Sequence, residues 1–125
     1  MILWNFGILA SRKVYFYDNG IRNAIIANFN PVELRNDTGA LWENYIMAER
    51  IKANSYSRRF YNSWFWRTAQ QQEVDYIEEE DGKLSAFEFK FNPKRTALAP
   101  LTFTRSYPEA TFKVISPDNL EEFLL

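Results

Sequence analysis

Two acidic residues and a lysine in the second half of the chain have the types and spacing to do chemistry together. They are Asp75, Glu88 and Lys90, in two segments that flank Asp81 and Gly82. The pattern of each segment indicates a β-strand, and Asp-Gly is typical of a tight hairpin turn. Two converging carboxylates repel each other and raise one pKa, unless a cation between them keeps both ionised. The residue types therefore predict a site for a divalent cation.

The register of this hairpin places the two carboxylates opposite each other. A two-residue turn pairs Glu80 with Lys83, and antiparallel partners then step away from the turn in opposite directions. The further expected pairs are Ile77 with Ala86, Asp75 with Glu88, and Glu73 with Lys90. Directly opposed residues have Cβ atoms roughly 5 Å apart, so Asp75 and Glu88 would destabilise the strands. A sequence chosen for stability alone would avoid this pairing, which indicates a function.

The second strand of the hairpin is expected to have two different faces. Phe87, Phe89 and Phe91 share the face that we assign to the core, whereas Glu88 and Lys90 share the opposite face. Two residues apart along a strand, these two side chains are about 7 Å from each other. Lys90 is then placed to orient, or to help deprotonate, a water that attacks a phosphodiester, while a bound metal would stabilise charge on the phosphate.

Composition restricts the chemistry further. The chain has 125 residues, is 46% hydrophobic, and is expected to form a single domain over residues 1–125. Because it contains no cysteine and no histidine, disulfides, thiolate sites and histidine bases are excluded. Carboxylates, lysine and hydroxyls remain, together with an oxygen-preferring cation, for which we expect Mg²⁺ or Mn²⁺. The net charge of −1 does not by itself indicate binding to nucleic acid.

No apolar run is long enough to span a bilayer, and the first ten residues, MILWNFGILA, lack the basic start and the cleavage site of a signal peptide. We therefore expect a cytoplasmic protein that does not bind membranes.

Strands and helices are expected to alternate along the chain. Besides the hairpin, we expect strands at 13–18, 59–68 and 111–115. We expect a short helix with Ile21, Ile25 and Ile26 on one side, a long helix at 39–53 capped by Asp37 or Thr38, a helix between 94 and 107, and a C-terminal helix with Ser116 as its N-cap. The long helix carries a broad apolar stripe made of Leu41, Trp42, Tyr45, Ile46 and Ala48. This order predicts an α/β (α+β) fold, a mixed β-sheet flanked by helices.

The segment EVDYI (73–77), followed after the turn by EFK (88–90), resembles the D…(D/E)xK core of the PD-(D/E)xK nuclease superfamily, which includes archaeal Holliday junction resolvases. This resemblance implies a restriction-endonuclease-like fold, metal binding by Asp75 and Glu88, and catalysis that also involves Lys90. In that fold an upstream helix commonly supplies another glutamate, and Glu43 stands in a matching place as a further catalytic and metal-binding residue. Val74 departs from the superfamily pattern, which has a proline before the aspartate.

A closer resemblance covers nearly the whole chain. The order KVYFYDNGIRNAI, GALWENYIMAERI, FWRT, EVDYIEE and AFEFK is similar to the C-terminal domain of unknown function that follows the ATPase module in a group of bacterial and archaeal AAA-type ATPases. The resemblance implies an upstream ATPase module as a partner. This chain contains no GxxxxGK[ST] motif, so it does not bind ATP by that device. We expect it to be that C-terminal domain without the ATPase module.

Other readings of these residues stay open. An alternating strand could pair Glu73 with Lys90 as an ordinary ion pair, and Glu43 could lie with Arg50 on a solvated helix face. Arg67, Lys94 and Arg95 are candidates for contacts with the phosphates of DNA, or plain surface residues. The run 78–81 is interpreted as a solvated hairpin tip.

Two functions follow from these residues. The first is a Mg²⁺-dependent nuclease that acts on DNA, either branched or single-stranded. The second is a catalytically inactive nuclease-fold module that docks a protein or DNA for its ATPase. The acidic pI of about 5.5 favours the second, whereas the intact set of Asp75, Glu88 and Lys90 favours the first. Because resolvase-like proteins commonly cut as dimers, a homodimer is one expected form.

Overall fold

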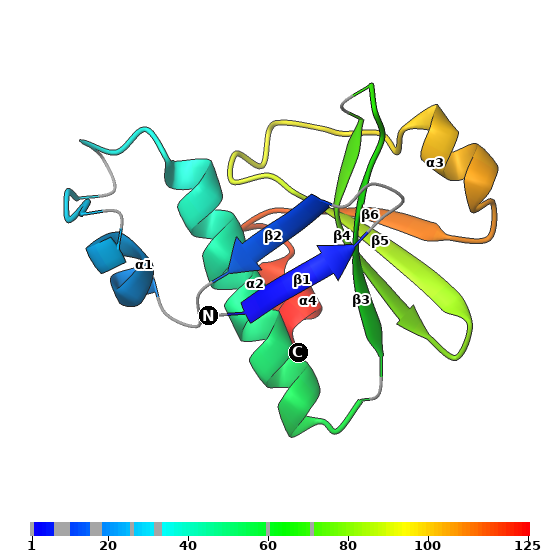
Figure 1. Cartoon of the computed structure of the whole chain (residues 1–125), viewed down its shortest axis with the longest axis horizontal. Coiled ribbons are helices and arrows are strands. Elements are labelled where there is room, and N and C mark those ends of the chain that lie inside the picture. Colours follow the sequence, from blue (N-terminus) through cyan, green and yellow to red (C-terminus); the bar gives the residue numbers. More distant parts are fainter. Residues whose placement is uncertain are drawn as a thin grey trace.

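A computed structural model describes residues 2–6, 11–15, 19–25, 27–31, 34–59, 61–70 and 72–125 of the chain. In chain order the elements are β1 (Ile2–Phe6), β2 (Ser11–Tyr15), α1 (Asn19–Ile25), α2 (Thr38–Tyr56), β3 (Asn62–Arg67), β4 (Glu73–Glu80), β5 (Lys83–Phe89), α3 (Leu101–Ser106), β6 (Thr111–Ile115) and α4 (Leu120–Leu124), as Figure 1 shows.

The centre of the fold is a four-stranded mixed sheet in the order β3-β4-β5-β6. β4 is antiparallel to both of its neighbours, β3 and β5, and β6 runs parallel to β5. β1 and β2 form a separate antiparallel pair. The predicted α+β class is therefore confirmed.

Helices cover both faces of the sheet. Figure 1 shows α2 and α4 on one side and α3 on the other. The first side holds a cluster made of Ile46, Met47, Tyr76, Phe87, Phe89, Ile115 and Phe123. The second side holds a cluster made of Trp66, Val74, Ile77, Ala86 and Phe103. Burying a large apolar side chain contributes about 1.5–3 kcal/mol, so these two clusters are the main source of stability.

The hairpin has the register that the sequence predicts. Glu80 pairs with Lys83 and Ile77 pairs with Ala86. Asp81 and Gly82 both have positive φ, 53° and 78°, which is the geometry of a type I′ turn. The ladder continues only as far as Tyr76 and Phe87. Asp75 and Glu88 lie just beyond its last pair.

The predicted helix at 39–53 is confirmed, and its predicted stripe is confirmed at Ile46 and Ala48 but not at Tyr45. α2 buries Ile46, Met47 and Ala48, whereas Tyr45 is 41% exposed. Asp37 is the N-cap residue, yet its side chain makes no capping hydrogen bond. Its carboxylate accepts two hydrogen bonds from Arg35 instead, at 2.7 and 2.8 Å. The predicted side-chain cap is therefore wrong, because a neighbouring guanidinium takes the carboxylate.

The remaining sequence predictions differ in outcome. The strand at 111–115 and the helix between 94 and 107 are confirmed as β6 and α3. The strand at 59–68 is shorter, as β3. Residues 16–18 of the strand predicted at 13–18, and Ile26, lie outside the described residues.

The predicted C-terminal helix begins later than expected, at Leu120 with Asn119 as its N-cap. The Asn119 side chain accepts a hydrogen bond from the N–H of Ser116 and donates one to the carbonyl of Val114, both at 2.8 Å. These bonds hold residues 116–119 in a turn, so Ser116 does not cap the helix.

Candidate carboxylate site at the open end of the hairpin

A β-bulge in β4 shapes the surroundings of Asp75. Trp64 pairs with Ile77, and Trp66 pairs with Val74, so β4 advances three residues while β3 advances two. The extra residue explains why Val74 and Ile77, an odd number of positions apart, lie in the same apolar cluster. Bulges bend a strand and redirect side chains, and they are frequent beside active sites. The bulge lies beside Asp75, which stands one residue beyond the last regular pair of β4 with β5.

Asp75 and Glu88 are brought close together at this point. The Asp75 carboxylate accepts a hydrogen bond from the backbone N–H of Phe89, with 2.9 Å between Oδ2 and N. The Glu88 side chain is only 17% exposed. Burial, and then the negative charge of Asp75, raise the pKa of Glu88 to about 7. The sequence prediction that these two carboxylates converge thus agrees with the geometry.

Lys90 lies beside Glu88. The distance from Lys90 Nζ to Glu88 Oε1 is 3.5 Å, and the Lys90 side chain is 32% exposed. The alternative pairing of Lys90 with Glu73 is wrong, because Glu73 forms an ion pair with Arg67 at 3.3 Å. Glu73 and Arg67 are cross-strand partners on the far side of the bulge, where the register with β5 no longer holds.

Glu43 lies on the side of α2 that faces the sheet. Arg50, seven residues later and thus nearly two full turns away, binds Glu78 of β4. Arg59, beyond the end of α2, binds Glu80, so α2 and β4 run in the same direction. Along α2, Glu43 comes about 10 Å before Arg50, and along β4, Asp75 comes about 10 Å before Glu78. Glu43 and Asp75 therefore lie toward the same end of the sheet. The Glu43 residue is half-buried.

The three carboxylates are nevertheless not gathered into one set. No group of three or more His, Cys, Asp or Glu side chains in the described part of the chain is arranged to hold a metal ion. The site consists of the pair Asp75 and Glu88 with Lys90 beside it, and Glu43 of α2 does not join them in a metal-binding group of the described residues.

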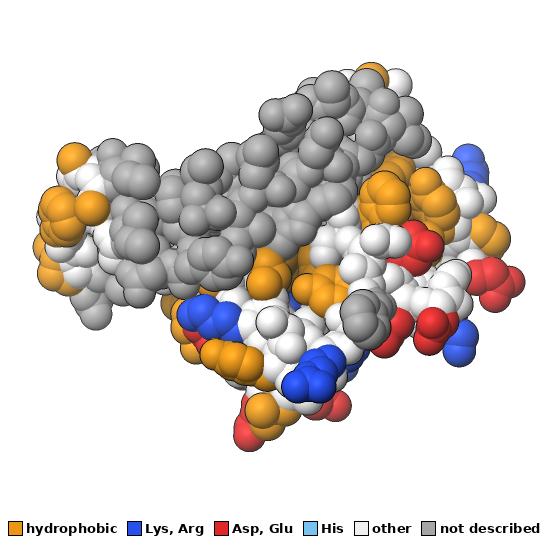
Figure 2. Space-filling model, turned by 60° about the horizontal axis from the view of Figure 1, so that its bottom comes forward, with side chains coloured by type: hydrophobic (Ala, Val, Ile, Leu, Met, Phe, Trp, Pro, Cys, Tyr) orange, Lys and Arg blue, Asp and Glu red, His pale blue; other side chains and the backbone are white. Residues whose placement is uncertain are grey.

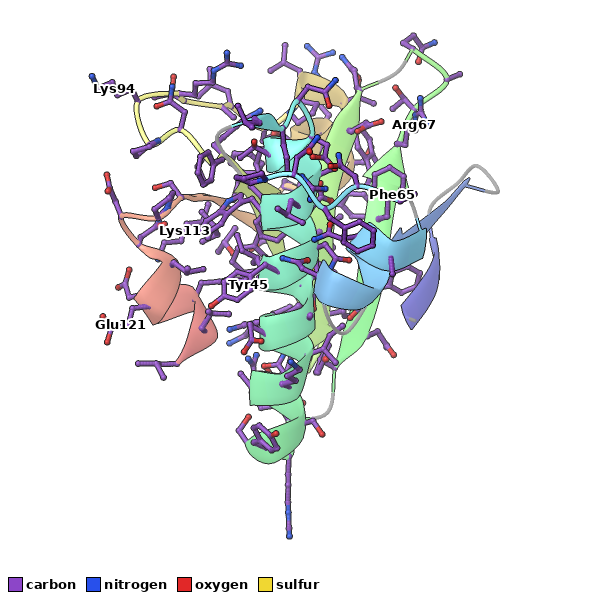
Figure 3. The ribbon with its side chains drawn as sticks, turned by 90° about the vertical axis from the view of Figure 1, so that its left-hand side faces the viewer. Tyr45, Phe65, Arg67, Lys94, Lys113 and Glu121 are labelled. Atoms are coloured by element: carbon purple, nitrogen blue, oxygen red, sulfur yellow. The ribbon has the colours of Figure 1, made fainter. Side chains whose placement is uncertain are left out.

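The basic candidates lie around this end of the sheet. Figure 3 shows Arg67 and Lys94 toward the same end of the molecule, on different sides of it. Arg67 is paired with Glu73, as described above. Lys94 and Arg95 are exposed, and their backbone N–H groups donate to the side chain and the carbonyl of Asn92, each at 3.0 Å. A tight turn thus presents two cations to solvent.

A protein-family model, described as a domain of unknown function (DUF4143), matches residues 38–120. The chain belongs to this family. The matched region includes the whole four-stranded sheet and the residues Glu43, Asp75, Glu88 and Lys90. A search of curated proteins and a search of solved structures gave no match. This membership confirms the predicted resemblance to a domain of unknown function.

The DUF4143 domain also contains a buried ionic cluster that sequence reasoning missed. Glu78 is 2% exposed, although the run 78–81 was interpreted as a solvated tip. Its carboxylate accepts two hydrogen bonds from Arg50, at 2.7 and 2.8 Å, and one each from Asn54 and Tyr76, at 3.1 and 3.2 Å. The interpretation is wrong for Glu78, because Arg50 and Asn54 of α2 cover it, whereas Asp81 at the turn is exposed.

This cluster also sets the charge of Glu78. Burial acts to raise the pKa of Glu78, but the hydrogen bonds and the charge of Arg50 outweigh it and hold the pKa below its ordinary value. Arg50 donates a further hydrogen bond to the carbonyl of Phe123 and lies 4.4 Å from the centre of its ring. Arg50 therefore joins α2, β4 and α4. The sequence does contain one signal for the burial of Glu78: this residue shares a strand face with Tyr76, a core residue.

No helix in the described ranges of this DUF4143 domain is long and apolar enough to cross a membrane.

Proposed function

We propose that this DUF4143 domain is a metal-dependent phosphodiesterase of the nuclease type that acts on DNA. The observation that carries the proposal is the close approach of Asp75 to the buried Glu88, where burial and then the charge of Asp75 raise the pKa of Glu88 to about 7. A fold that holds two carboxylates together at a bulge loses stability by doing so, unless a cation binds there.

The donor set suits a hard divalent cation. Mg²⁺ is usually held by one or two carboxylates and keeps several of its waters, so Asp75 and Glu88 suffice as protein ligands. Mn²⁺ accepts the same oxygen donors. Glu43, toward the same end of α2, would complete the shell of waters around the ion. When bound, the ion would stabilise the negative charge that develops on the phosphate.

Lys90 would act on the water that attacks the phosphodiester. Its ammonium group is 3.5 Å from Glu88 Oε1, so its position is fixed next to the carboxylate pair. A cation in this place orients a water through its lone pairs and favours the loss of the water's proton. Arg67, Lys94 and Arg95 would contact phosphates on either side of the scissile bond.

The proposal extends to the fold family and the partner. The types and order of Asp75, Glu88 and Lys90 match the D…(D/E)xK pattern of the PD-(D/E)xK nucleases. They lie at the end of an antiparallel hairpin whose second strand, β5, pairs in parallel with β6. This agrees with a restriction-endonuclease-like sheet. We also propose that the domain acts with an upstream AAA-type ATPase module, forms a homodimer and is located in the cytoplasm.

A second function is favoured by the ion pairs. Arg67 is paired with Glu73, and Lys90 with Glu88, so the cations around the site are partly neutralised. The described residues also contain no three-carboxylate group. Under this second proposal the domain keeps a nuclease-like sheet but docks a protein or DNA without cutting it.

A cleavage assay separates the two proposals. Branched, single-stranded and linear DNA would be incubated with the protein in Mg²⁺ or Mn²⁺, beside Glu88→Gln and Lys90→Met variants. Glu121→Gln is the matched control, because Glu121 is an exposed residue of α4. The nuclease proposal requires cleavage that is lost in the two site variants and kept in the control. Cleavage that persists in all four proteins would indicate a contaminant, and DNA binding without cleavage would favour the docking module.

A further inference from the structure

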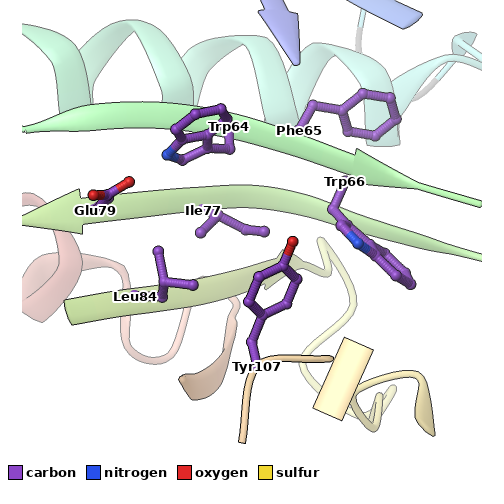
Figure 4. Close-up of a pocket in the computed structure, with 7 residues that line it drawn as sticks. All are labelled: Trp64, Phe65, Trp66, Ile77, Glu79, Leu84 and Tyr107. Atoms are coloured by element: carbon purple, nitrogen blue, oxygen red, sulfur yellow. The ribbon is translucent and has the colours of Figure 1, made fainter. Parts of the chain in front are cut away.

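A second concave site lies on the α3 side of the sheet, toward the hairpin turn. Its volume is about 380 Å³. Figure 4 shows its lining: the rings of Trp64, Trp66 and Tyr107, the aliphatic side chains of Ile77 and Leu84, and the carboxylate of Glu79. Binding sites for small ligands have volumes of about 300–1,000 Å³. The site is therefore large enough for one extended side chain.

Glu79 differs from the other glutamates of β4. Glu73, Glu78 and Glu80 are each paired with an arginine, namely Arg67, Arg50 and Arg59 respectively. None of the ion pairs found within the described ranges involves Glu79. Figure 2 shows acidic side chains beside hydrophobic ones on the right of that view. The pocket thus has a carboxylate that the described residues do not neutralise.

The aromatic residues add to the attraction for a cation. Trp64 is 39% exposed although it is one of the largest side chains of the sheet. Figure 4 shows the hydroxyl end of Tyr107 directed into the space between Trp64 and Trp66. Indole and phenol rings attract a cation over their faces, and tryptophan does so most strongly. A carboxylate beside such rings selects a positive charge on an apolar body.

We propose that this pocket binds an arginine side chain of a partner protein. A guanidinium group is planar, stacks on indole rings and is more weakly hydrated than an ammonium group, so arginine fits better than lysine. Its methylene stem would pack on Ile77 and Leu84, while its charge lies near Glu79. This inference is independent of the proposed nuclease activity, because Glu79 is four residues from Asp75 along β4 and away from the carboxylate pair.

Binding of model compounds to the whole chain tests the inference. The probes are N-acetylarginine methylamide, the citrulline compound of the same shape without the charge, and a short peptide with one central arginine. The readout is the NMR shift of the tryptophan indole N–H signals during titration. We expect saturable binding of the arginine compound, with citrulline about tenfold weaker or more. We expect the peptide to bind more tightly than the single residue.

Two variants complete the test. Glu79→Gln keeps the size of the side chain and should weaken arginine binding about tenfold, whereas Glu121→Gln, on α4, should leave it unchanged. Trp64→Leu should also weaken it. The inference would be overturned by an absence of saturable shifts, by equal binding of citrulline, or by equal losses in the two glutamine variants. Equal affinity for peptide and single residue would overturn the protein partner and indicate a small organic cation.

Discussion

Asp75 accepts a hydrogen bond from the backbone N–H of Phe89 across the open end of the β4–β5 hairpin, at 2.9 Å. The regular ladder ends one pair earlier, at Tyr76 and Phe87. A side-chain carboxylate thus takes over the role of a backbone carbonyl in joining the two strands. The same bond fixes a negative charge beside the buried Glu88, and this arrangement underlies the first two predictions.

The metal-free protein should lose stability as the pH rises from about 4.5 to about 7. In the folded state Glu88 has a pKa of about 7 against an ordinary value of 4.5, so the folded state keeps a proton that the unfolded state has released. Stability from this group is complete below the unfolded pKa and is lost as the pH passes the folded pKa, by about 3 kcal/mol in all. Urea unfolding across this pH range measures it, and Glu88→Gln should remove this part of the slope. An equal slope in the variant would contradict the prediction.

Asp75→Asn should lower the pKa of Glu88 but leave it above its ordinary value. The asparagine oxygen can still accept the hydrogen bond from Phe89, while the negative charge is gone. Burial, which is the larger cause of the shift, remains. Titration of the Glu88 carboxyl carbon by NMR tests this. An unchanged pKa would show that Asp75 contributes nothing to the shift.

Arg50→Ala should destabilise the domain by about 3–5 kcal/mol, because it leaves the buried Glu78 carboxylate without its cation. Lys52→Ala is the control: Lys52 pairs with Glu49 on the helix surface, where both side chains are more than a third exposed, and its loss should stay within about 0.5 kcal/mol. Denaturant unfolding of both variants gives the comparison. Equal losses of stability in the two variants would show that the buried cluster around Glu78 is not a main source of stability.

Arg58→Gly should stabilise the domain by about 1 kcal/mol. Arg58 follows the C-cap of α2 with a φ of 55°, a conformation that costs a side-chain-bearing residue about that much. The N–H groups of Arg58 and Arg59 donate to the carbonyls of Ser55 and Asn54, which closes the helix as a Schellman-type end. Arg58→Ala keeps the strain and serves as the control in thermal unfolding. An equal gain in both variants would assign the effect to the arginine side chain and not to the backbone.

Local signals in the sequence account for what could be predicted. The Asp81-Gly82 turn, with alternation on both sides, determines the register of the hairpin, because a two-residue turn with positive φ admits one pairing. The same register, extended by one pair, predicts that Asp75 and Glu88 converge, although the regular ladder ends at Tyr76 and Phe87.

Features that depend on another element escaped prediction. The pairing of Glu73 with Arg67 requires the bulge in β4, which no local residue signals. The burial of Glu78 depends on which face of α2 meets the sheet, and that face is partly polar. β1 was not predicted because its apolar residues do not alternate, and its strand form follows from pairing with β2.

The most direct test of the central claim is the binding of Mg²⁺ and Mn²⁺ by calorimetry at a pH well above 7, where Glu88 is ionised. Wild type, Glu88→Gln and the control Glu121→Gln would be compared. If Asp75 and Glu88 form a cation site, wild type and control bind the metal, and Glu88→Gln does not. If none of the three binds metal, while Glu88→Gln unfolds at a higher temperature than wild type, the carboxylate pair is not a cation site.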